Sequence, residues 1–441
     1  MSAEVPERRR DPTTSEGRAI VAAVRDATAL LLDRDGYEAL NTNAIARVAG
    51  VSIGSLYQYF PDKHAIVVEL ARRLEQNALE SAMERAAAID VGDPRAVTSS
   101  LVDVLLDPRL ANLATRRALL LQVPAAWVLP ASGPTDSSTE RLLAQVMDQL
   151  ALRDGPRDVM SFVVFHAVEG AVEDAILRRP ETLGDPALRA ELFALAWRYA
   201  APDGATLEAP ESPPPAPWPE PLADVAARLR EESPERGAEV AVRETPSTAR
   251  GRASVEAILG AMLELLTEGG WAATSARAVA RRAGVSPATL YRYFPDLRAM
   301  VAELARRREA ATLQLLSAPL GAPGEGSLAA LLRGLIEPLV ERARPDRRAR
   351  RALLAEVPQA WVHEVRGEVS SAIESIGRRQ LEARGEVRGG DPARLAAVFG
   401  AALRHCLESA VVLRPELLDD PRFIEELVSL GARYLLRRAA W

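Results

Sequence analysis

Apolar residues recur at helical spacing along almost the whole chain. In two stretches, four apolar side chains fall three or four residues apart, so that they share one face of a helix. These faces comprise Val21, Val24, Ala27 and Leu31 in one helix and Val255, Ile258, Ala261 and Leu265 in the other. Gly36 and Gly269–Gly270 follow the two faces, where a helix commonly ends in a left-handed residue. Alternating apolar and polar runs are scarce, so the pattern predicts an all-α protein.

The pattern occurs twice because the chain contains an internal repeat. Residues 49–73 (AGVSIGSLYQYFPDKHAIVVELARR) return as residues 283–307 (AGVSPATLYRYFPDLRAMVAELARR), at an offset of 234 residues. Two further blocks match: 116–127 with 350–361 at the same offset, and 191–200 with 426–435 at an offset of 235. This period is far too long for a solenoid. We therefore expect two copies of a unit of about 200 residues, which we call copy one and copy two.

The repeat and the local composition predict where the domains begin and end. The expected segments are a disordered N-terminal arm (1–17), head one (18–73), body one (74–200), a Pro-rich linker (201–250), head two (251–307) and body two (308–441). The stretch Glu211–Pro221 is too rich in proline to form a packed element, which favours a disordered spacer. A protein-docking motif is the alternative, because Trp218 is an unusual residue for a spacer.

Composition places the protein in a broad class. The 441 residues include 55 basic and 61 acidic side chains, so any affinity for nucleic acid must come from local patches. Cys406 is the single cysteine, which excludes an internal disulfide framework and suits a reducing cytoplasm. The N-terminal residues lack the apolar segment of a secretory signal, and we find no apolar run of about 18 residues. We expect a soluble cytoplasmic protein without a membrane anchor.

Each head contains the pattern of a helix-turn-helix motif. In head one, Asn41 is a plausible N-cap of a first short helix, Gly50 makes the turn, and Ser52 caps a second helix that ends before Pro61. The corresponding parts of head two are Ser275, Gly284 and Ser286, followed by Pro287 at the first helical position. In such motifs the second helix lies in the major groove, and its first residues meet the edges of the bases.

The motif A-G-V-S-x-x-[ST]-L-Y-x-Y-F-P, present in both copies, resembles that of the tetracycline-repressor (TetR) family of bacterial transcription regulators. The resemblance covers about 55 residues at the start of each copy. Members of that family are homodimers, in which each subunit has one DNA-binding head and one helical ligand-binding body. The resemblance implies two such subunits in tandem, so that one chain forms a pseudo-dimer on a double-stranded DNA operator.

Carried over by position, the resemblance implies a set of DNA-contacting residues. They are Asn41, Asn43, Ser52, Ile53, Gly54, Ser55, Tyr57, Gln58, Tyr59 and Lys63 in head one, and Ser275, Arg277, Ser286, Pro287, Ala288, Thr289, Tyr291, Arg292, Tyr293 and Arg298 in head two. Arginine is the best bidentate reader of guanine, so Arg277 and Arg292 are the sharpest candidates for base reading. Tyr59, Tyr293 and Lys63 would bind phosphate. Ordinary packing of the tyrosines, and a solvated helix face for Arg292, are the alternatives.

The two heads are unequal in charge. Between residues 275 and 297 head two has four arginines, whereas head one has only Arg47 and Lys63 over the matching stretch. Leu297 replaces Lys63 in copy two, and Arg298 is a possible stand-in. Head two is therefore expected to bind DNA more tightly, and head one could be partly degenerate.

The resemblance also implies roles for the bodies. Their last two helices would pair across the dimer, here as a four-helix interface within one chain. The four expected helices are Arg157–Arg179, Pro186–Ala200, Ala393–Arg414 and Pro421–Arg437. The middle helices would enclose a cavity for a small-molecule effector, for which Trp127, Trp361 and His166 are the candidate ligand-binding residues. The alternative is a structural role, which is the commoner one for such residues.

The sequence contains no recognisable catalytic constellation. It lacks a phosphate-binding loop, a zinc-ligand spacing and a nucleophile elbow, so we expect no enzyme activity, no metal site and no cofactor. We predict a transcriptional regulator, most simply a repressor, and leave open further dimerisation of the chain. The alternative is a ligand-binding or protein-interaction module in which one or both heads no longer read DNA.

Overall fold

Every regular element that the structure describes is a helix, which confirms the all-α prediction. The computed structural model describes residues 6–88, 92–110, 113–128, 138–205, 246–317, 324 and 326–437. Most of the predicted linker, including Trp218, lies outside these residues. Within them, the only pairing of strand type is a single isolated bridge between Val387 and Leu436.

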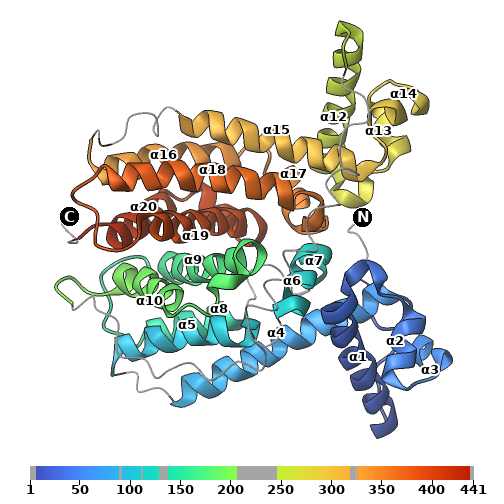
Figure 1. Cartoon of the computed structure of the whole chain (residues 1–441), viewed down its shortest axis with the longest axis horizontal. Helices are drawn as coiled ribbons and strands as arrows, with labels where there is room; N and C mark the ends of the chain where they lie inside the picture. The colour runs from blue at the N-terminus through green and yellow to red at the C-terminus, as the bar shows by residue number, and fades with distance from the viewer. Residues whose placement is uncertain are drawn as a thin grey trace.

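The helices follow the same order in both copies. Copy one consists of α1 (Ser15–Ala39), α2 (Thr42–Ala49), α3 (Ile53–Tyr59), α4 (Lys63–Ala88), α5 (Pro94–Leu110), α6 (Leu113–Gln122), α7 (Ala125–Val128), α8 (Ser138–Met147), α9 (Arg157–Arg178) and α10 (Pro186–Ala200). Copy two consists of α12 (Ala249–Gly269), α13 (Ala276–Arg282), α14 (Pro287–Tyr293), α15 (Leu297–Ser317), α16 (Leu328–Ala343), α17 (Arg347–Arg351), α18 (His363–Glu382), α19 (Pro392–Leu413) and α20 (Pro421–Leu435). The two heads lie at one end of the molecule and the two bodies at the other (Figure 1).

The bodies form one unit, whereas each head has its own core. A single apolar cluster joins the two bodies, and the Phe162 and Phe423 rings meet in it at 6.1 Å. α9 packs against α19 and α10 against α20, in the middle of the molecule (Figure 1). The four-helix interface implied by the family resemblance is therefore present within one chain.

Local sequence explains where these helices start and stop. Asp185, Asp391 and Asp420 cap α10, α19 and α20, and in each case a proline follows at the first helical position, where its missing N–H costs nothing. In α1, Gly36 adopts positive φ (72°) and kinks the helix near its end, and α12 ends at Gly270, which also has positive φ (70°).

Among the described helices, α19 alone is long and apolar enough to cross a membrane, with a mean hydropathy of 1.4. In the structure, 72% of that apolar window is buried inside the protein, where α19 packs between α9 and α18. Its apolar character is thus used in the interface between the two bodies.

Candidate functional site

Each head presents the start of its second motif helix on the surface. Ser52 accepts the backbone N–H of Ser55 at 2.9 Å, and Ser286 accepts that of Thr289 at 3.1 Å, so both serines act as N-caps. The exposed candidates are Asn41, Asn43, Ser52, Ile53, Gly54, Tyr57 and Gln58 in head one, and Ser275, Arg277, Ser286, Pro287, Ala288, Tyr291 and Arg292 in head two. Ser55, Thr289, Lys63 and Arg298 are half-buried.

The second motif helix of each head, α3 in head one and α14 in head two, is called its recognition helix below. The two tyrosines of each recognition helix have different environments. Tyr57 is 38% exposed and Tyr291 46%, so both rings can reach a ligand on the surface. Tyr59 and Tyr293 are only 4% and 3% exposed, and their rings pack in the cores of the heads. The Tyr293 hydroxyl reaches the start of α12, where a Cβ on Gly251 would lie 2.8 Å from it.

An arginine lies over the buried tyrosine in both heads, although it comes from a different place in each. In head two, Arg292 of α14 lies 4.6 Å from the ring centre of Tyr293 and donates to its hydroxyl at 2.7 Å. In head one, where Gln58 is the counterpart of Arg292, Arg10 of the N-terminal arm lies 5.1 Å from the ring centre of Tyr59. A cation–π contact therefore occurs at the equivalent position of each head.

The N-terminal arm differs from the disordered segment expected from its sequence. From residue 6 onward it lies along head one, where the backbone N–H of Arg9 donates to the Tyr59 carbonyl at 2.7 Å. The Arg8 guanidinium also pairs with Glu69 of α4 at 3.3 Å. These contacts with residues about 50 to 60 positions away satisfy the arm's polar groups, and they cannot be read from its local composition. The arm brings three arginines to the less basic head.

Not all the arginines of head two are oriented for DNA. Arg282 pairs with Glu268 at 2.8 Å and Glu264 at 3.2 Å, both on α12. The hydrogen bonds that Arg282 donates to Glu268 and Glu264 raise the pKa of its guanidinium. Arg282, the last residue of α13, is exposed as Arg277 and Arg292 are, but its guanidinium is held against α12.

The predicted phosphate-binding cations both lie over aromatic rings. The Lys63 ammonium is 4.5 Å from the ring centre of Tyr37, and the Arg298 guanidinium is 5.9 Å from that of Trp361. These contacts fix the cations at the first turn of α4 and α15, beside the recognition helices.

The two tryptophans lie where a head meets its body. Trp127 packs edge-on against His64 at 5.9 Å, and Trp361 against Trp271 at 5.4 Å. Neither tryptophan is among the described residues that line the two cavities below. Both side chains pack against the apolar clusters of the heads, and the binding of a ligand by Trp127 and Trp361 stays a prediction.

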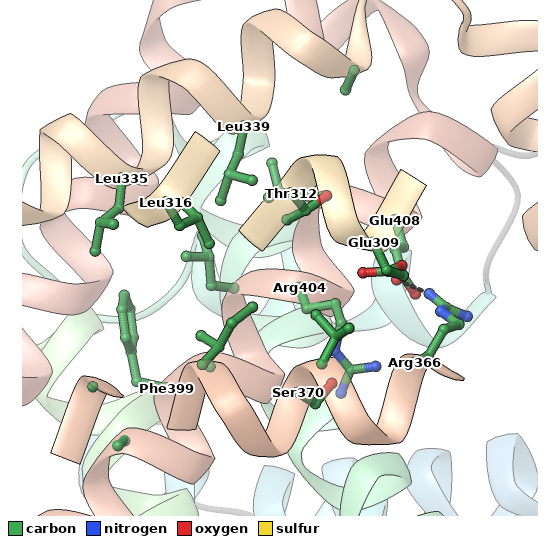
Figure 2. Close-up of a pocket in the computed structure, with 18 of the residues that line it drawn as sticks. Glu309, Thr312, Leu316, Leu335, Leu339, Arg366, Ser370, Phe399, Arg404 and Glu408 are labelled. Atoms are coloured by element: carbon green, nitrogen blue, oxygen red, sulfur yellow. Dashed lines mark hydrogen bonds and ion pairs between the residues drawn. The ribbon is translucent and has the colours of Figure 1, made fainter. Parts of the chain in front are cut away.

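A first cavity of about 250 Å³ lies inside body two. One end is apolar, with Leu316, Leu335, Leu339 and Phe399 in its wall, and the other end is polar (Figure 2). The polar end comprises Glu309, Thr312, Arg366, Ser370, Arg404 and Glu408. An apolar chamber with a few converging polar groups is the usual form of a small-molecule site.

A second cavity of about 580 Å³ lies between the copies. Its wall includes His166 from α9 and both His363 and His405 from copy two. Burial, together with Arg117 and Arg366, lowers the pKa of His363 to about 4, so this imidazole is neutral near pH 7. Five residues belong to the walls of both cavities: Leu354, Arg366, Ser370, Arg404 and Glu408.

Reciprocal ion pairs relate the copies as a two-fold axis would. Arg153 of copy one pairs with Glu426 of copy two, and Arg388 of copy two pairs with Glu191 of copy one. A tyrosine completes each pair: Tyr199 donates to Glu426 at 2.6 Å and Tyr434 donates to Glu191 at 2.8 Å. At the offset of 235, each of these residues is the counterpart of its opposite number. Such i-to-j and j-to-i contacts define an isologous interface.

Other contacts across the interface are not reciprocal. Asp174 is 3% exposed and pairs with Arg404 of copy two at 2.5 Å, and with Arg178 and Arg179 of its own copy. Burial alone would raise the pKa of Asp174, but the guanidinium groups of Arg404, Arg178 and Arg179 outweigh it and lower that pKa. The counterpart of Asp174 is Ser409, so this ion pair occurs once in the molecule.

Gly170 and His405 occupy the same position of the repeat and meet across the interface. A Cβ on Gly170 would lie 2.6 Å from the His405 Cγ and 3.2 Å from the Ala401 carbonyl oxygen. α9 and α19 can therefore approach only because one copy has a glycine where the other has a histidine.

The arrangement of heads and bodies agrees with comparison to known sequences. The sequence model described as bacterial regulatory proteins, tetR family, matches residues 24–70 and again residues 258–304. The chain belongs to the TetR family, in two tandem copies. A second model, the tetracyclin repressor-like C-terminal domain, matches residues 327–435 in body two of this TetR-family chain.

Several individual TetR-family proteins are similar to parts of the chain. The repressor KstR of Mycolicibacterium smegmatis is 40% identical over 109 residues, which are 23% of this chain and 52% of that protein. An uncharacterized HTH-type transcriptional regulator of Mycobacterium bovis is 29% identical over 160 residues, 36% of this chain and 81% of that protein. The chain spans 26%, 52% and 29% of the lengths of three KstR relatives.

Among solved structures, the crystal structure of native NalD, a secondary repressor of a multidrug efflux pump in Pseudomonas aeruginosa, is similar to part of the chain. It is 19% identical with a TM-score of 0.36, and the match covers 43% of this chain and all of NalD.

Some neighbours of the candidate residues were not predicted. The Thr42 hydroxyl lies 3.0 Å from that of Tyr57, and Arg10 lies over Tyr59. His405 lies 3.4 Å from Glu169, across the interface between the copies. The residues in each of these contacts are separated in sequence, and only the family resemblance, applied to the two copies, placed α9 opposite α19.

Proposed function

We propose that this chain is a DNA-binding transcriptional regulator of the cytoplasm, acting as a repressor, in which one molecule supplies both heads of the operator complex. The observation that carries the proposal is the pair of reciprocal ion pairs, Arg153 with Glu426 and Arg388 with Glu191. They hold the copies as two subunits of a dimer are held. Two heads that stand in this way can enter major grooves about 34–36 Å apart.

Charge and steric fit favour pairing between the copies over pairing of either copy with its own kind. If copy one paired with itself, Asp174 would meet Glu169, because Glu169 is the counterpart of Arg404. If copy two paired with itself, His405 would meet another His405 in the space that Gly170 now leaves. Asp174 would keep Arg178 and Arg179 of its own copy, but it would lose Arg404 and face a like charge at a buried site. Such a contact is destabilising, so the pseudo-dimer is the favoured assembly.

The heads would read different sequences. Head two offers Arg277 and Arg292, which suit guanine, while head one offers Ile53, Gly54 and Ser55 and takes its basic groups from the arm. The operator would therefore consist of two unlike half-sites. The first cavity in body two would take a small apolar molecule with a polar end as effector.

The test is to find the operator upstream of the chain's own gene by gel shift and to weigh the complex by light scattering. One protein molecule per site, on DNA without a palindrome, is the expected result. Two chains bound to a strict palindrome would overturn the pseudo-dimer assignment.

Matched arginine variants of head two test the reading of bases. Arg292→Ala should cost about 1–3 kcal/mol of binding free energy and relax the preference at one base pair. Arg282→Ala, which removes an equal charge from the flank of the same head, should have little effect on that preference. Equal loss of sequence preference in both variants would contradict the assignment.

A further inference from the structure

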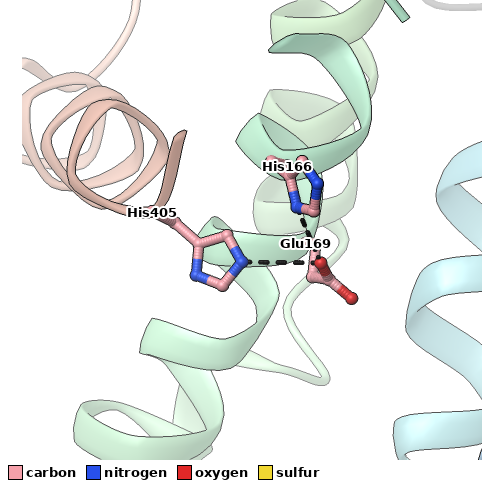
Figure 3. A group of neighbouring side chains, drawn as sticks. All are labelled: His166, Glu169 and His405. Carbon is pink, nitrogen blue, oxygen red and sulfur yellow. Dashed lines mark hydrogen bonds and ion pairs between the residues drawn. The ribbon is translucent and has the colours of Figure 1, made fainter. Parts of the chain in front are cut away.

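A cluster of two imidazoles and one carboxylate lies where α9 crosses α19. His166 and Glu169 come from copy one and His405 from copy two (Figure 3). The Nδ1 atom of His166 is 3.1 Å from Glu169 Oε2, and the same oxygen is 3.4 Å from His405 Nε2. One donor atom from each of the three residues lies within 4.8 Å of the others.

These distances match the edges of a metal coordination sphere. Zn²⁺ binds histidine nitrogen and carboxylate oxygen at about 2.0–2.1 Å in tetrahedral geometry, which places neighbouring ligand atoms about 3.3 Å apart. Both measured distances to the Glu169 oxygen are close to that edge. The third edge, between the two histidines, needs only a small adjustment of the side chains. Two histidines and one carboxylate form a ligand set known from zinc sites with an open fourth position.

The surroundings suit a cation. His166, Glu169 and His405 all line the second cavity, which gives an ion a route to the site. The Glu173 carboxylate lies 3.7 Å from Nδ1 of His405 and adds a second negative charge. Arg404, next to His405 in sequence, is paired with the buried Asp174.

We propose that His166, Glu169 and His405 bind one divalent transition-metal ion of the zinc class, shared between the two copies. Glu173 orients His405 from the other side, as an outer-shell carboxylate does. Cys406 is not a ligand, because its thiol is directed at the Val163 carbonyl at 3.5 Å. The site is separate from the proposed contacts with DNA.

The repeat predicts the stoichiometry of this site. The counterparts of His166, Glu169 and His405 are Ala401, Arg404 and Gly170, none of which can supply the same ligand. The duplicated chain can therefore form the site once, and only with both copies present. The ion would join α9 to α19 and stabilise their contact.

The experiment uses the full chain, stripped with a chelator and titrated with Zn²⁺ in a calorimeter. One equivalent should bind and should raise the Tm. Co²⁺ in its place should give the visible absorption of a four- or five-coordinate ion. His405→Ala and Glu169→Gln should each weaken binding by more than the roughly 10–100-fold that outer-shell changes cost.

The chain offers two matched controls among its four histidines. His363 lines the same cavity outside the cluster, and His64 lies at head one, so His363→Ala and His64→Ala should retain one equivalent. Tm values without metal establish that each variant is folded. A folded wild-type chain that binds no Zn²⁺ would show that the cluster is a hydrogen-bond network only. Binding that survives His405→Ala and Glu169→Gln would equally overturn the proposal.

Discussion

Gly170 stands against His405 across the interface between the copies, although the two residues are counterparts in the repeat. The contact between α9 and α19 depends on this difference, since a Cβ at position 170 would overlap the histidine. The glycine itself is unfavourable for a helix by about 1 kcal/mol relative to alanine. Close packing of the copies is the compensating gain.

Gly170→Ala should therefore lower the free energy of unfolding, by about 1–3 kcal/mol for an overpacked site. Urea unfolding measures the loss. Gly400→Ala in α19 is the matched control, because nothing lies within 4 Å of a Cβ there and the better helix propensity of alanine remains. Adding His405→Gly to Gly170→Ala should relieve the overlap. Additive effects of the two substitutions would show that they do not meet as described.

The heads and the duplication could be predicted from the sequence because their signals are local. Ser52 caps α3, Gly50 makes the turn, and Leu56 is buried, each for reasons contained in a few neighbouring residues. The repeat then gave the second head, and the family resemblance implied the pairing of the late helices.

The contacts between distant segments could not be predicted. Three features depend on how segments far apart in sequence meet in space. They are the contact of the arm with head one, the position of Trp127 where head one meets its body, and the approach of His405 to His166. Glu169 follows His166 by three residues, but nothing in the sequence indicates that His405, more than 200 residues away, lies beside them. The sequence accordingly predicted no metal site.

The contact between the N-terminal arm and Tyr59 predicts that Arg10 contributes to DNA binding by head one. Because its guanidinium lies over Tyr59 as that of Arg292 lies over Tyr293, Arg10→Ala should weaken DNA binding through head one. If Arg10 contacts one phosphate, the slope of log K against log salt should become shallower by about 0.9. Fluorescence anisotropy at several salt concentrations measures it. Arg422→Ala, at an exposed arginine on α20 in body two, should leave the slope unchanged.

The lowered pKa of Asp174 predicts that the free energy of unfolding falls at acid pH. Its pKa is lowered in the folded state, so its contribution is present above the unfolded value of about 3.9 and is lost as the pH falls toward the folded pKa. Asp174→Asn should lower the free energy of unfolding by about 3–5 kcal/mol at pH 7, since it breaks a buried pair. The variant's free energy of unfolding should also depend less on pH at the acid end. Unfolding from pH 7 to pH 3 measures both effects. Asp26→Asn, at a side chain that is 75% exposed, is the control and should change neither.

Cleavage within the linker tests the interface directly. A protease cut between Ser212 and Glu220 should leave the halves associated at micromolar concentration, because the two bodies share one core and reciprocal ion pairs. Size-exclusion chromatography of the nicked protein should give one peak, which separates on dilution. The nicked Asp174→Asn variant should separate at higher concentration. Two peaks from the nicked wild-type protein at micromolar concentration would contradict the shared interface.

The glycine facing a histidine also bears on how such a chain can change over generations. In a homodimer, every substitution at the axis is made on both sides at once, so a histidine could never have a glycine opposite. Fusion let the two sides of the contact mutate one at a time. Once His405 had come to face Gly170, copy two could no longer pair with itself without a clash between its two histidines. The duplication is in this sense hard to reverse, because α9 and α19 are now complementary to each other.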